Sequence, residues 1–562
     1  MNLKYAVFVL AMATGVVKGQ KQDYQMPLNI PALLSGNYGE LRANHFHSGI
    51  DFKTQGVVGK PVFAVMDGYV SRVSVSPWGY GLAIYLTHPN GTTSVYGHLD
   101  RFNKTIAKYV SDHQYKNETF SADLTLKPNE IKVKKGEEIA RAGNSGSSGG
   151  PHLHFEIRNT KTEEPLDPLA YLPAVFKDTT KPKLKSVVVY AKEDEGVVNG
   201  LVTQKEFPYV IPQKGKGAPH IKGPINAWGE IAFGVKANDY MDGVSNIFGV
   251  KTIALVVDKD TVFKSNIDRY RFDETRYLNA WIDYDLWRTN RSFVTKSYVE
   301  NGNKLRFLKA KRQGWVTIDE ERPYDVTYVL SDYFGNTTKV KFAVQGKKQA
   351  IPKEERTYDK IFKYNADNNF GNKKVKLDID KGNLYDHVYF TYKERLDTAG
   401  YASVHVLNDK PIPLHKSGTV RIKVEDDKLE NKRAYGIASV DKGRKRWIGG
   451  TYKNGWVEAS IRELGSFTII ADTAKPSISA VGKDKWAANK KITLKIGDNL
   501  SGVQDYKCKI DGKFVVFALD GKTGLLTYKI EPARVAPGKH VLEVWLVDQC
   551  GNERTYKQNF AY

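Results

Sequence analysis

Cysteine is scarce in this chain, with two among 562 residues, Cys508 and Cys550. Both lie in the last hundred residues, so they cannot contribute to a metal site near the N-terminus unless the domains fold back on one another. No cysteine follows the apolar N-terminal stretch either, which excludes a lipoprotein anchor at that point.

Long hydrophobic runs are also absent beyond the first twenty residues. Lys4 is followed by a mostly apolar run from Tyr5 to Val17 and then by Lys18-Gly19, which is the pattern of a secretory signal peptide over residues 1–19. The run is too short to span a membrane stably. We therefore expect export, to a periplasm or to the cell surface and medium, without a transmembrane segment after signal removal.

Charge is unbalanced, with a formal net charge of +22, but lysine and arginine are spread over the whole length. No nucleic-acid fold signature accompanies them, so an anionic cell wall or membrane surface is the favoured target. A soluble, self-repelling surface explains the charge equally simply. The length alone predicts three or four domains.

Histidine is concentrated: seven of the twelve, at positions 45, 47, 88, 98, 113, 152 and 154, fall within 110 residues. His47 and Asp51 stand four residues apart, which places them on one face of a helix or strand. His152 and His154 have the period of two of a half-buried strand. Such clustering favours a metal site over isolated structural histidines, because a catalytic zinc takes three protein ligands and keeps one position open.

Three separate motifs carry a family resemblance: His47-x-x-x-Asp51, Tyr96-Gly97-His98 and His152-x-His154. In this order, embedded in glycines, they resemble the lysostaphin-type (LytM-like) zinc endopeptidases that cut peptide bridges in bacterial cell walls. The resemblance covers about residues 38–170. It implies one zinc per chain bound by His47, Asp51 and His154, with His98 and His152 as unliganded catalytic histidines.

Chemistry supports these roles, since zinc makes water acidic enough to supply a nucleophile at neutral pH. Neighbouring imidazoles can deprotonate that water, stabilise an oxyanion or protonate the leaving amine. The sequence does not divide these roles between His98 and His152. Glu156 is interpreted as a solvated or supporting carboxylate rather than a base, and His45 as supporting or structural.

The predicted fold class is mainly β. A compact antiparallel peptidase domain is expected over residues 20–175, with a polar insertion at 100–132 that either walls the substrate groove or lies free on the surface. The glycine-rich stretch 143–150 lacks the Lys-Ser/Thr ending of a phosphate loop, so we expect it to bring backbone close to substrate.

Later residues repeat faintly: Asp178-Thr-Thr-Lys-Pro recurs as Asp472-Thr-Ala-Lys-Pro, and Asp332-x-x-Gly-Asn recurs from Asp548. This recurrence predicts related β-sandwich modules. We expect a sandwich-like domain with an insertion over 176–347, a β-rich domain over 348–471 and an immunoglobulin-like domain over 472–562, able to dock envelope proteins.

In an exported protein, Cys508 and Cys550 are most simply a disulfide, worth roughly 3 to 4 kcal/mol. The segments beginning at Asp239 and Asp498 resemble fragments of calcium loops. Neither has the downstream glutamate, and turns between strands explain them.

The sequence thus favours an exported zinc metalloendopeptidase acting on the stem-peptide cross-links of peptidoglycan, with no nucleic-acid partner. One alternative is a non-catalytic LytM-like protein that binds the wall or regulates a hydrolase, although such proteins typically lose a ligand or a catalytic histidine. Another is a zinc protease of extracellular proteins.

Overall fold

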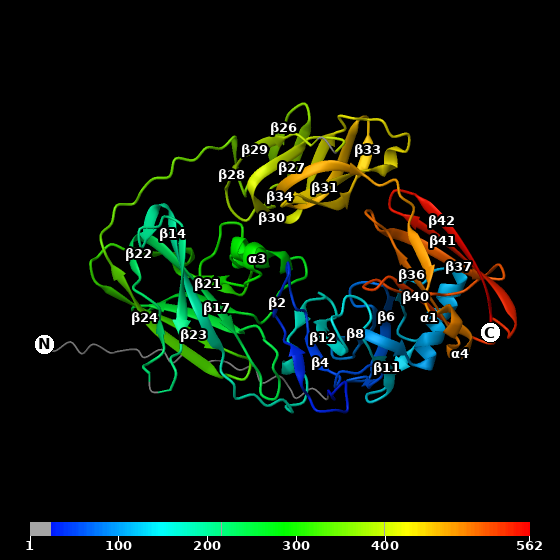
Figure 1. Ribbon diagram of the computed structural model, residues 1–562. Coiled ribbons are helices and arrows are strands. Elements are labelled where there is room, and N and C mark those ends of the chain that lie inside the picture. Colours follow the sequence, from blue (N-terminus) through cyan, green and yellow to red (C-terminus); the bar gives the residue numbers. More distant parts are fainter. Residues whose placement is uncertain (1–23, 215, 398–399) are drawn as a thin grey trace.

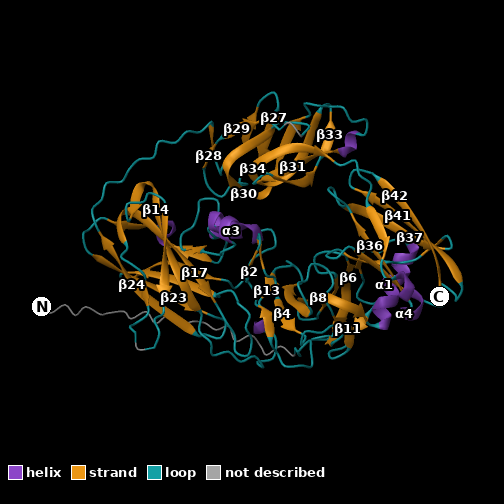
Figure 2. Ribbon diagram, in the orientation of Figure 1, coloured by secondary structure: helices purple, strands orange, loops and turns teal. Residues whose placement is uncertain are grey.

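A computed structural model describes residues 24–214, 216–397 and 400–562 (Figure 1). Strands make up 49% of the chain and helices 8%, which confirms a mainly β protein (Figure 2). The expected signal peptide, 1–19, lies outside the described residues. Among the described residues, none of the helices has the length and apolar character needed to cross a bilayer.

The first module is built on an antiparallel sheet that brings the three histidine motifs onto neighbouring strands. Its order is β1 (Leu34–Gly36), β4 (Ile50–Lys53), β12 (His152–Asn159), β8 (Thr92–Phe102), β7 (Leu82–Thr87), β6 (Gly68–Val75) and β10 (Lys132–Val133). In the centre, His154 stands opposite both Asp51 on β4 and Gly97 on β8.

Strand β12 is buried on both faces, whereas its alternating sequence predicts burial on one. Leu153, Phe155 and Ile157 fill the core, as alternation requires. The polar face, with Glu156 and Arg158, is covered as well, and Phe272 of the next module lies against the Arg158 guanidinium. The second module therefore forms part of the surroundings of this face.

The insertion at 100–132 is ordered. It extends β8, forms helix α1 (Lys104–Lys116) behind the N-cap Asn103, and returns as β9 (Ala122–Thr125), which pairs with β6. Tyr115 on α1 packs against Phe514 and under the Arg534 guanidinium of the last module. The insertion thus makes a contact between the first and last modules.

Residues 183–346 pair into one sheet of eleven strands. Its main path is β16 (His220–Ile221), β15 (Gln204–Val210), β14 (Lys183–Val198), β17 (Asn226–Asn238), β24 (Thr337–Gly346), β23 (Pro323–Ser331), β18 (Thr252–Val257), β19 (Asp260–Asn266) and β21 (Leu308–Ala310). Within the segment 262–322, where the sequence indicates an insertion, lie the helices α2 (Leu278–Trp281) and α3 (Tyr284–Asn290) and the short strands β20 (Thr295–Lys296) and β22 (Val316–Ile318).

One hydrophobic core runs through the first two modules. Phe46, beside the His47 motif, packs against Tyr270 and Trp281 of the second module at ring distances of 5.1 and 6.1 Å. The junction near residue 176 therefore does not separate two independent cores.

The third module has its own core and an eight-stranded sheet. Its path is β26 (Asn368–Gly371), β27 (Val375–Ile379), β30 (Val404–Lys423), β34 (Trp456–Ala471), β31 (Tyr435–Asp441) and β32 (Arg444–Gly449).

The last module encloses a third core between two four-stranded sheets. One sheet contains β35 (Ser477–Ala480), β36 (Lys491–Gly497), β40 (Leu525–Lys529) and β39 (Ala518–Asp520), and the other contains β38 (Lys513–Phe514), β37 (Val503–Ile510), β41 (Lys539–Asp548) and β42 (Glu553–Ala561). The chain curves round so that this module returns beside α1 of the first (Figure 1).

The disulfide predicted between Cys508 and Cys550 is not formed, and both cysteines are free and buried. Cys508 lies in the core opposite Val544, whereas Cys550 follows the end of β41, beyond Asp548. At a strand rise of ~3.4 Å per residue, Val544 and Asp548 are roughly 14 Å apart. A disulfide needs Cα atoms within about 7 Å, so sharing a domain was not enough to pair these residues.

Candidate metal centre

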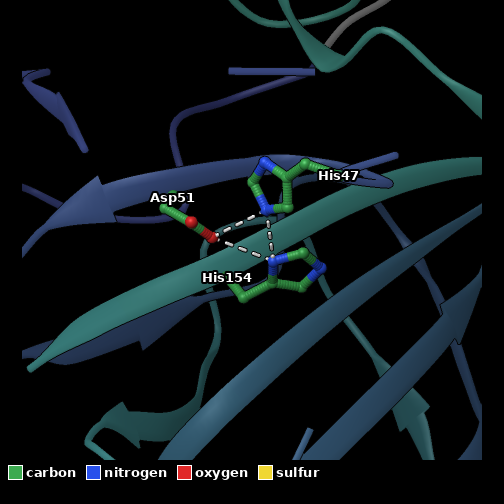
Figure 3. A group of neighbouring side chains, drawn as sticks. All are labelled: His47, Asp51 and His154. Carbon is green, nitrogen blue, oxygen red and sulfur yellow. Dashed lines mark hydrogen bonds and ion pairs between the residues drawn. The ribbon is translucent and has the colours of Figure 1, made fainter. Parts of the chain in front are cut away.

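His47, Asp51 and His154 converge on one point (Figure 3). His47 lies in the turn between β3 (His45–Phe46) and β4, Asp51 on β4 and His154 on β12. Nε2 of His47 is 3.0 Å from both Oδ1 of Asp51 and Nδ1 of His154, and the last two atoms are 2.9 Å apart. All three side chains are buried.

A zinc ion fits this donor set. Two imidazole nitrogens and one carboxylate oxygen are common zinc ligands, and donors bound about 2.1 Å from a tetrahedral zinc lie roughly 3.4 Å apart. The observed triangle is close to that spacing. Three protein donors also leave one position for water or substrate, as in catalytic sites.

Each of the three side chains is held from behind by a second hydrogen bond. Nδ1 of His47 is 2.8 Å from the Asn37 carbonyl, and Oδ2 of Asp51 accepts from the Arg42 guanidinium at 3.0 Å. Nε2 of His154 is 2.8 Å from Oε1 of Glu156. Such partners fix the tautomer and direction of a ligating imidazole.

Glu156 is completely buried, so the solvated carboxylate considered for it from the sequence is wrong. Oε1 also accepts from Ser48 at 2.6 Å and Tyr80 at 2.5 Å, and Oε2 accepts from Arg158 at 2.6 Å. Although burial opposes ionisation, Arg158 and His154 hold the pKa of Glu156 far below its usual value. Glu156 is therefore a permanent anion, and its hydrogen bond orients the imidazole of His154.

Electrostatics keep the metal-free centre charged. Burial disfavours the ionised forms, but His47 and His154 hold the pKa of Asp51 well below its usual range. Against the same burial, hydrogen bonds to Asp51 and Glu156 raise the pKa of His154 to about 9. At neutral pH a proton on His154 thus occupies the place that a metal would take.

His98 and His152 lie beside this triangle, with ring centroids 4.8 Å apart. Nδ1 of His98 contacts the Ser145 carbonyl at 2.9 Å, and Nδ1 of His152 contacts the Gly150 carbonyl at 2.8 Å. Burial lowers the pKa of His98 to about 3 and lowers that of His152 as well. Both are therefore neutral imidazoles at neutral pH.

The glycine-rich loop holds these two histidines through backbone contacts. A Cβ atom at Gly146 would lie 2.3 Å from the Gly81 amide nitrogen, so the two segments approach too closely for any side chain. From the last module, the Lys522 ammonium donates to the Asn144 and Ser148 carbonyls at 2.5 and 3.1 Å. The last module thus contacts the loop beside the site.

The structure brings together all five residues that the sequence singled out. His45 is exposed, and its Nδ1 atom contacts the Ala43 carbonyl of its own loop at 2.9 Å. The sequence did not indicate that the second module supports the His47 segment. Tyr270 donates to the His47 carbonyl at 2.9 Å, and Thr275 accepts from the Phe46 amide at 2.8 Å. These contacts span more than 220 residues, and no local pattern in the sequence signals them.

Comparisons with known proteins agree with the geometry. Residues 45–115 and 112–168 match the model of peptidase family M23, and residues 359–472 match that of the Zu5-like domain. An uncharacterized metalloprotease of Haemophilus influenzae is 34% identical over 150 residues, 26% of each chain. The DD-carboxypeptidase/endopeptidase Mpg of Neisseria meningitidis is 31% identical over 124 residues, 22% of each chain.

Among solved structures, the catalytic domain of lysostaphin from Staphylococcus simulans is 25% identical and covers 25% of this chain and 90% of that domain, with a TM-score of 0.19. The chain spans only about a quarter of the length of the curated relatives it matches. The residues matched by the peptidase M23 model, 45–168, contain all three histidine motifs. Residues 45–168 thus belong to a peptidase M23 (LytM-type) domain.

Proposed function

We propose that this chain is an exported zinc metalloendopeptidase that hydrolyses peptide cross-links of bacterial peptidoglycan. The observation that carries the proposal is the convergence of His47, Asp51 and His154 beside two neutral, unliganded histidines. The substrate class is supported by the name of a relative in Vibrio cholerae, peptidoglycan DD-endopeptidase ShyB, which is 32% identical over 111 residues.

His47, Asp51 and His154 would hold the zinc, which supplies Lewis acidity to a peptide carbonyl and to water. Nε2 of His152 lies 3.6 Å from Oδ1 of Asp51. His152 and His98, both neutral, take up the proton of the attacking water and return it to the leaving amine. Once protonated, either imidazole donates to the developing oxyanion.

Digestion of purified peptidoglycan by the zinc-loaded full chain tests the substrate, with products identified by mass. Cross-linked fragments should give way to uncross-linked stem peptides, and a chelator should abolish this change. A glycine-rich extracellular protein is incubated in parallel. Cleavage of that protein with intact peptidoglycan would contradict the proposed substrate, and cleavage of neither by folded, zinc-loaded protein would favour a binding or regulatory role.

A further inference from the structure

Three aspartates of the second module meet at a place the peptidase chemistry does not use. Asp178 precedes β14, Asp239 directly follows β17 and Asp332 directly follows β23. One carboxylate oxygen from each lies within 4.8 Å of the others. The strand ends thus assemble a group that the separate sequence motifs do not indicate.

Asp239 is the unusual member. It is 6% exposed, and its Oδ1 atom is buried without a hydrogen-bond partner. A buried carboxylate oxygen normally has a hydrogen-bond partner, since burial without one destabilises the folded state. No ion pair joins Asp178, Asp239 or Asp332 to a lysine, arginine or histidine within the described part of the chain.

The other two carboxylates are held in fixed directions. Asp178 accepts from the amides of Thr180 and Asp242 at 3.0 and 3.3 Å. Asp332 accepts from the amide and side chain of Asn336 at 2.8 and 2.7 Å, and the same side chain donates to the Asp178 carbonyl at 3.0 Å. These hydrogen bonds form a frame that holds carboxylate oxygens of Asp178 and Asp332 near Asp239, although all three carboxyl groups carry the same charge when ionised.

The same frame recurs in the last module, around Asp472, Asp498 and Asp548. Asp548 accepts from the amide and side chain of Asn552, whose side chain donates to the Asp472 carbonyl. Asp498, like Asp239, directly follows a strand and has a buried Oδ1 without a partner. The second and last modules thus share this frame, and in each of them the Oδ1 atom of one aspartate is buried without a hydrogen-bond partner.

We propose that Asp178, Asp239 and Asp332 bind a calcium ion. All the donors are oxygens, which suits a hard cation. Calcium binds oxygens at 2.3 to 2.6 Å, so two oxygens on opposite sides of the ion are roughly 4.8 Å apart. Magnesium demands a tighter octahedron and retains its waters, which favours calcium for an irregular buried group.

The ion connects the second module to the metal centre of the first. In the segment that follows Asp239, Asn246 donates to the Ser35 carbonyl at 3.3 Å. Gly249 and Asn37 exchange two hydrogen bonds of 2.8 and 3.0 Å, and the Asn37 carbonyl is the partner of His47. Calcium anchors the start of the segment that supports this metal ligand.

Calorimetric titration of calcium into the zinc-loaded full chain tests the proposal. Asp239→Asn, which keeps the shape of the side chain, should bind one calcium ion fewer than the wild type. Asp260→Asn is the matched control, because it removes the same charge from an exposed strand of the same module, where Asp260 pairs with Lys311. The result is the difference in the number of bound calcium ions between the variants, so an ion bound by Asp472, Asp498 and Asp548 does not affect it.

Thermal unfolding gives a second readout. In chelator at pH 9, above the pKa of about 8 to which burial raises the Asp239 carboxyl group, Asp239→Asn should be more stable than the wild type, because it removes a negative charge beside two other carboxylates. In millimolar calcium the order should reverse. A purely structural role predicts no reversal. If Asp239→Asn does not fold, Asp178→Asn is measured in its place. Equal calcium binding by wild type and variant, or equal competition by magnesium at the same concentration, would overturn the proposal.

Discussion

At the scale of single residues, the candidate metal centre consists of three buried side chains whose remaining polar atoms already have hydrogen-bond partners. His154 is the clearest case, because Asp51 and Glu156 bond to its two nitrogens at 2.9 and 2.8 Å. Without metal, this environment stabilises the imidazolium. A zinc ion bound here would therefore compete with a proton for the same nitrogen.

This competition predicts a pH-dependent stability for the metal-free protein. The pKa of His154 is about 9 in the folded state, against about 6.5 in an unfolded chain. A raised folded pKa contributes stability that is complete below pH 6.5 and is lost as pH rises through 9, by about 3 kcal/mol in all. Urea unfolding in chelator between pH 6 and 9.5 measures it.

Metal-free His154→Gln, which cannot carry that charge, is the control and should lack this decline. An identical decline in both proteins would contradict the assignment of the shifted group to His154.

At the scale of elements, two central strands and one turn carry the site. The pairing of β12 with β4 and β8 places His154 opposite Asp51 and Gly97. The turn before β4 is held from outside the sheet by Tyr270, which is fully buried beneath it. The second module thus fixes the position of His47.

Tyr270→Phe should reduce zinc affinity, by about 10-fold to 100-fold, as expected when support for a ligand is lost. The variant removes only the bond to the His47 carbonyl and should cost about 1 kcal/mol of stability. Tyr328→Phe is the matched control. It removes an equally buried hydroxyl that pairs with Ser297 in the same module, far from the centre.

Competition against a chromophoric chelator measures zinc affinity, and urea unfolding measures stability. Both variants should lose similar stability, and only Tyr270→Phe should lose zinc affinity. Equal zinc affinity in the two would mean that the second module does not position His47.

The sequence singled out the five candidate site residues because three short local motifs resemble those of a known family. The structure places the five together, and their roles as ligands and proton carriers stay predictions. The sequence could not predict Asn37 or Tyr270, since a carbonyl partner and a hydroxyl 223 residues away leave no periodic signal. The predicted disulfide between Cys508 and Cys550 is wrong for a related reason, because sharing a domain does not fix the strand register. Cys508 lies opposite the middle of β41, whereas Cys550 follows the end of that strand.

At the scale of the molecule, the modules are not independent. The first two share one core, and the last contacts α1 and the glycine-rich loop. The predicted boundary near residue 176 follows a change of sequence pattern, but Phe46 continues the core across it. A peptidase module cut out at that boundary would expose apolar surface.

Fragments test this continuity. A fragment of residues 24–346 should unfold cooperatively and bind one zinc ion, whereas residues 24–177 should bind a hydrophobic dye and hold zinc weakly. Dye fluorescence, unfolding curves and zinc content measure the difference. Equal zinc affinity in the two fragments would show that the second module is dispensable for the metal centre.

We propose that His47, Asp51 and His154 hold zinc while the neighbouring histidines, His98 and His152, move protons. Zinc content and peptidoglycan products are measured on the same preparations of wild type, His152→Ala and His154→Ala, with His113→Ala, a half-buried histidine on α1, as control. We expect one zinc in all except His154→Ala, and products only from wild type and the control. Products from zinc-loaded His152→Ala, or zinc retained by His154→Ala, would contradict the account.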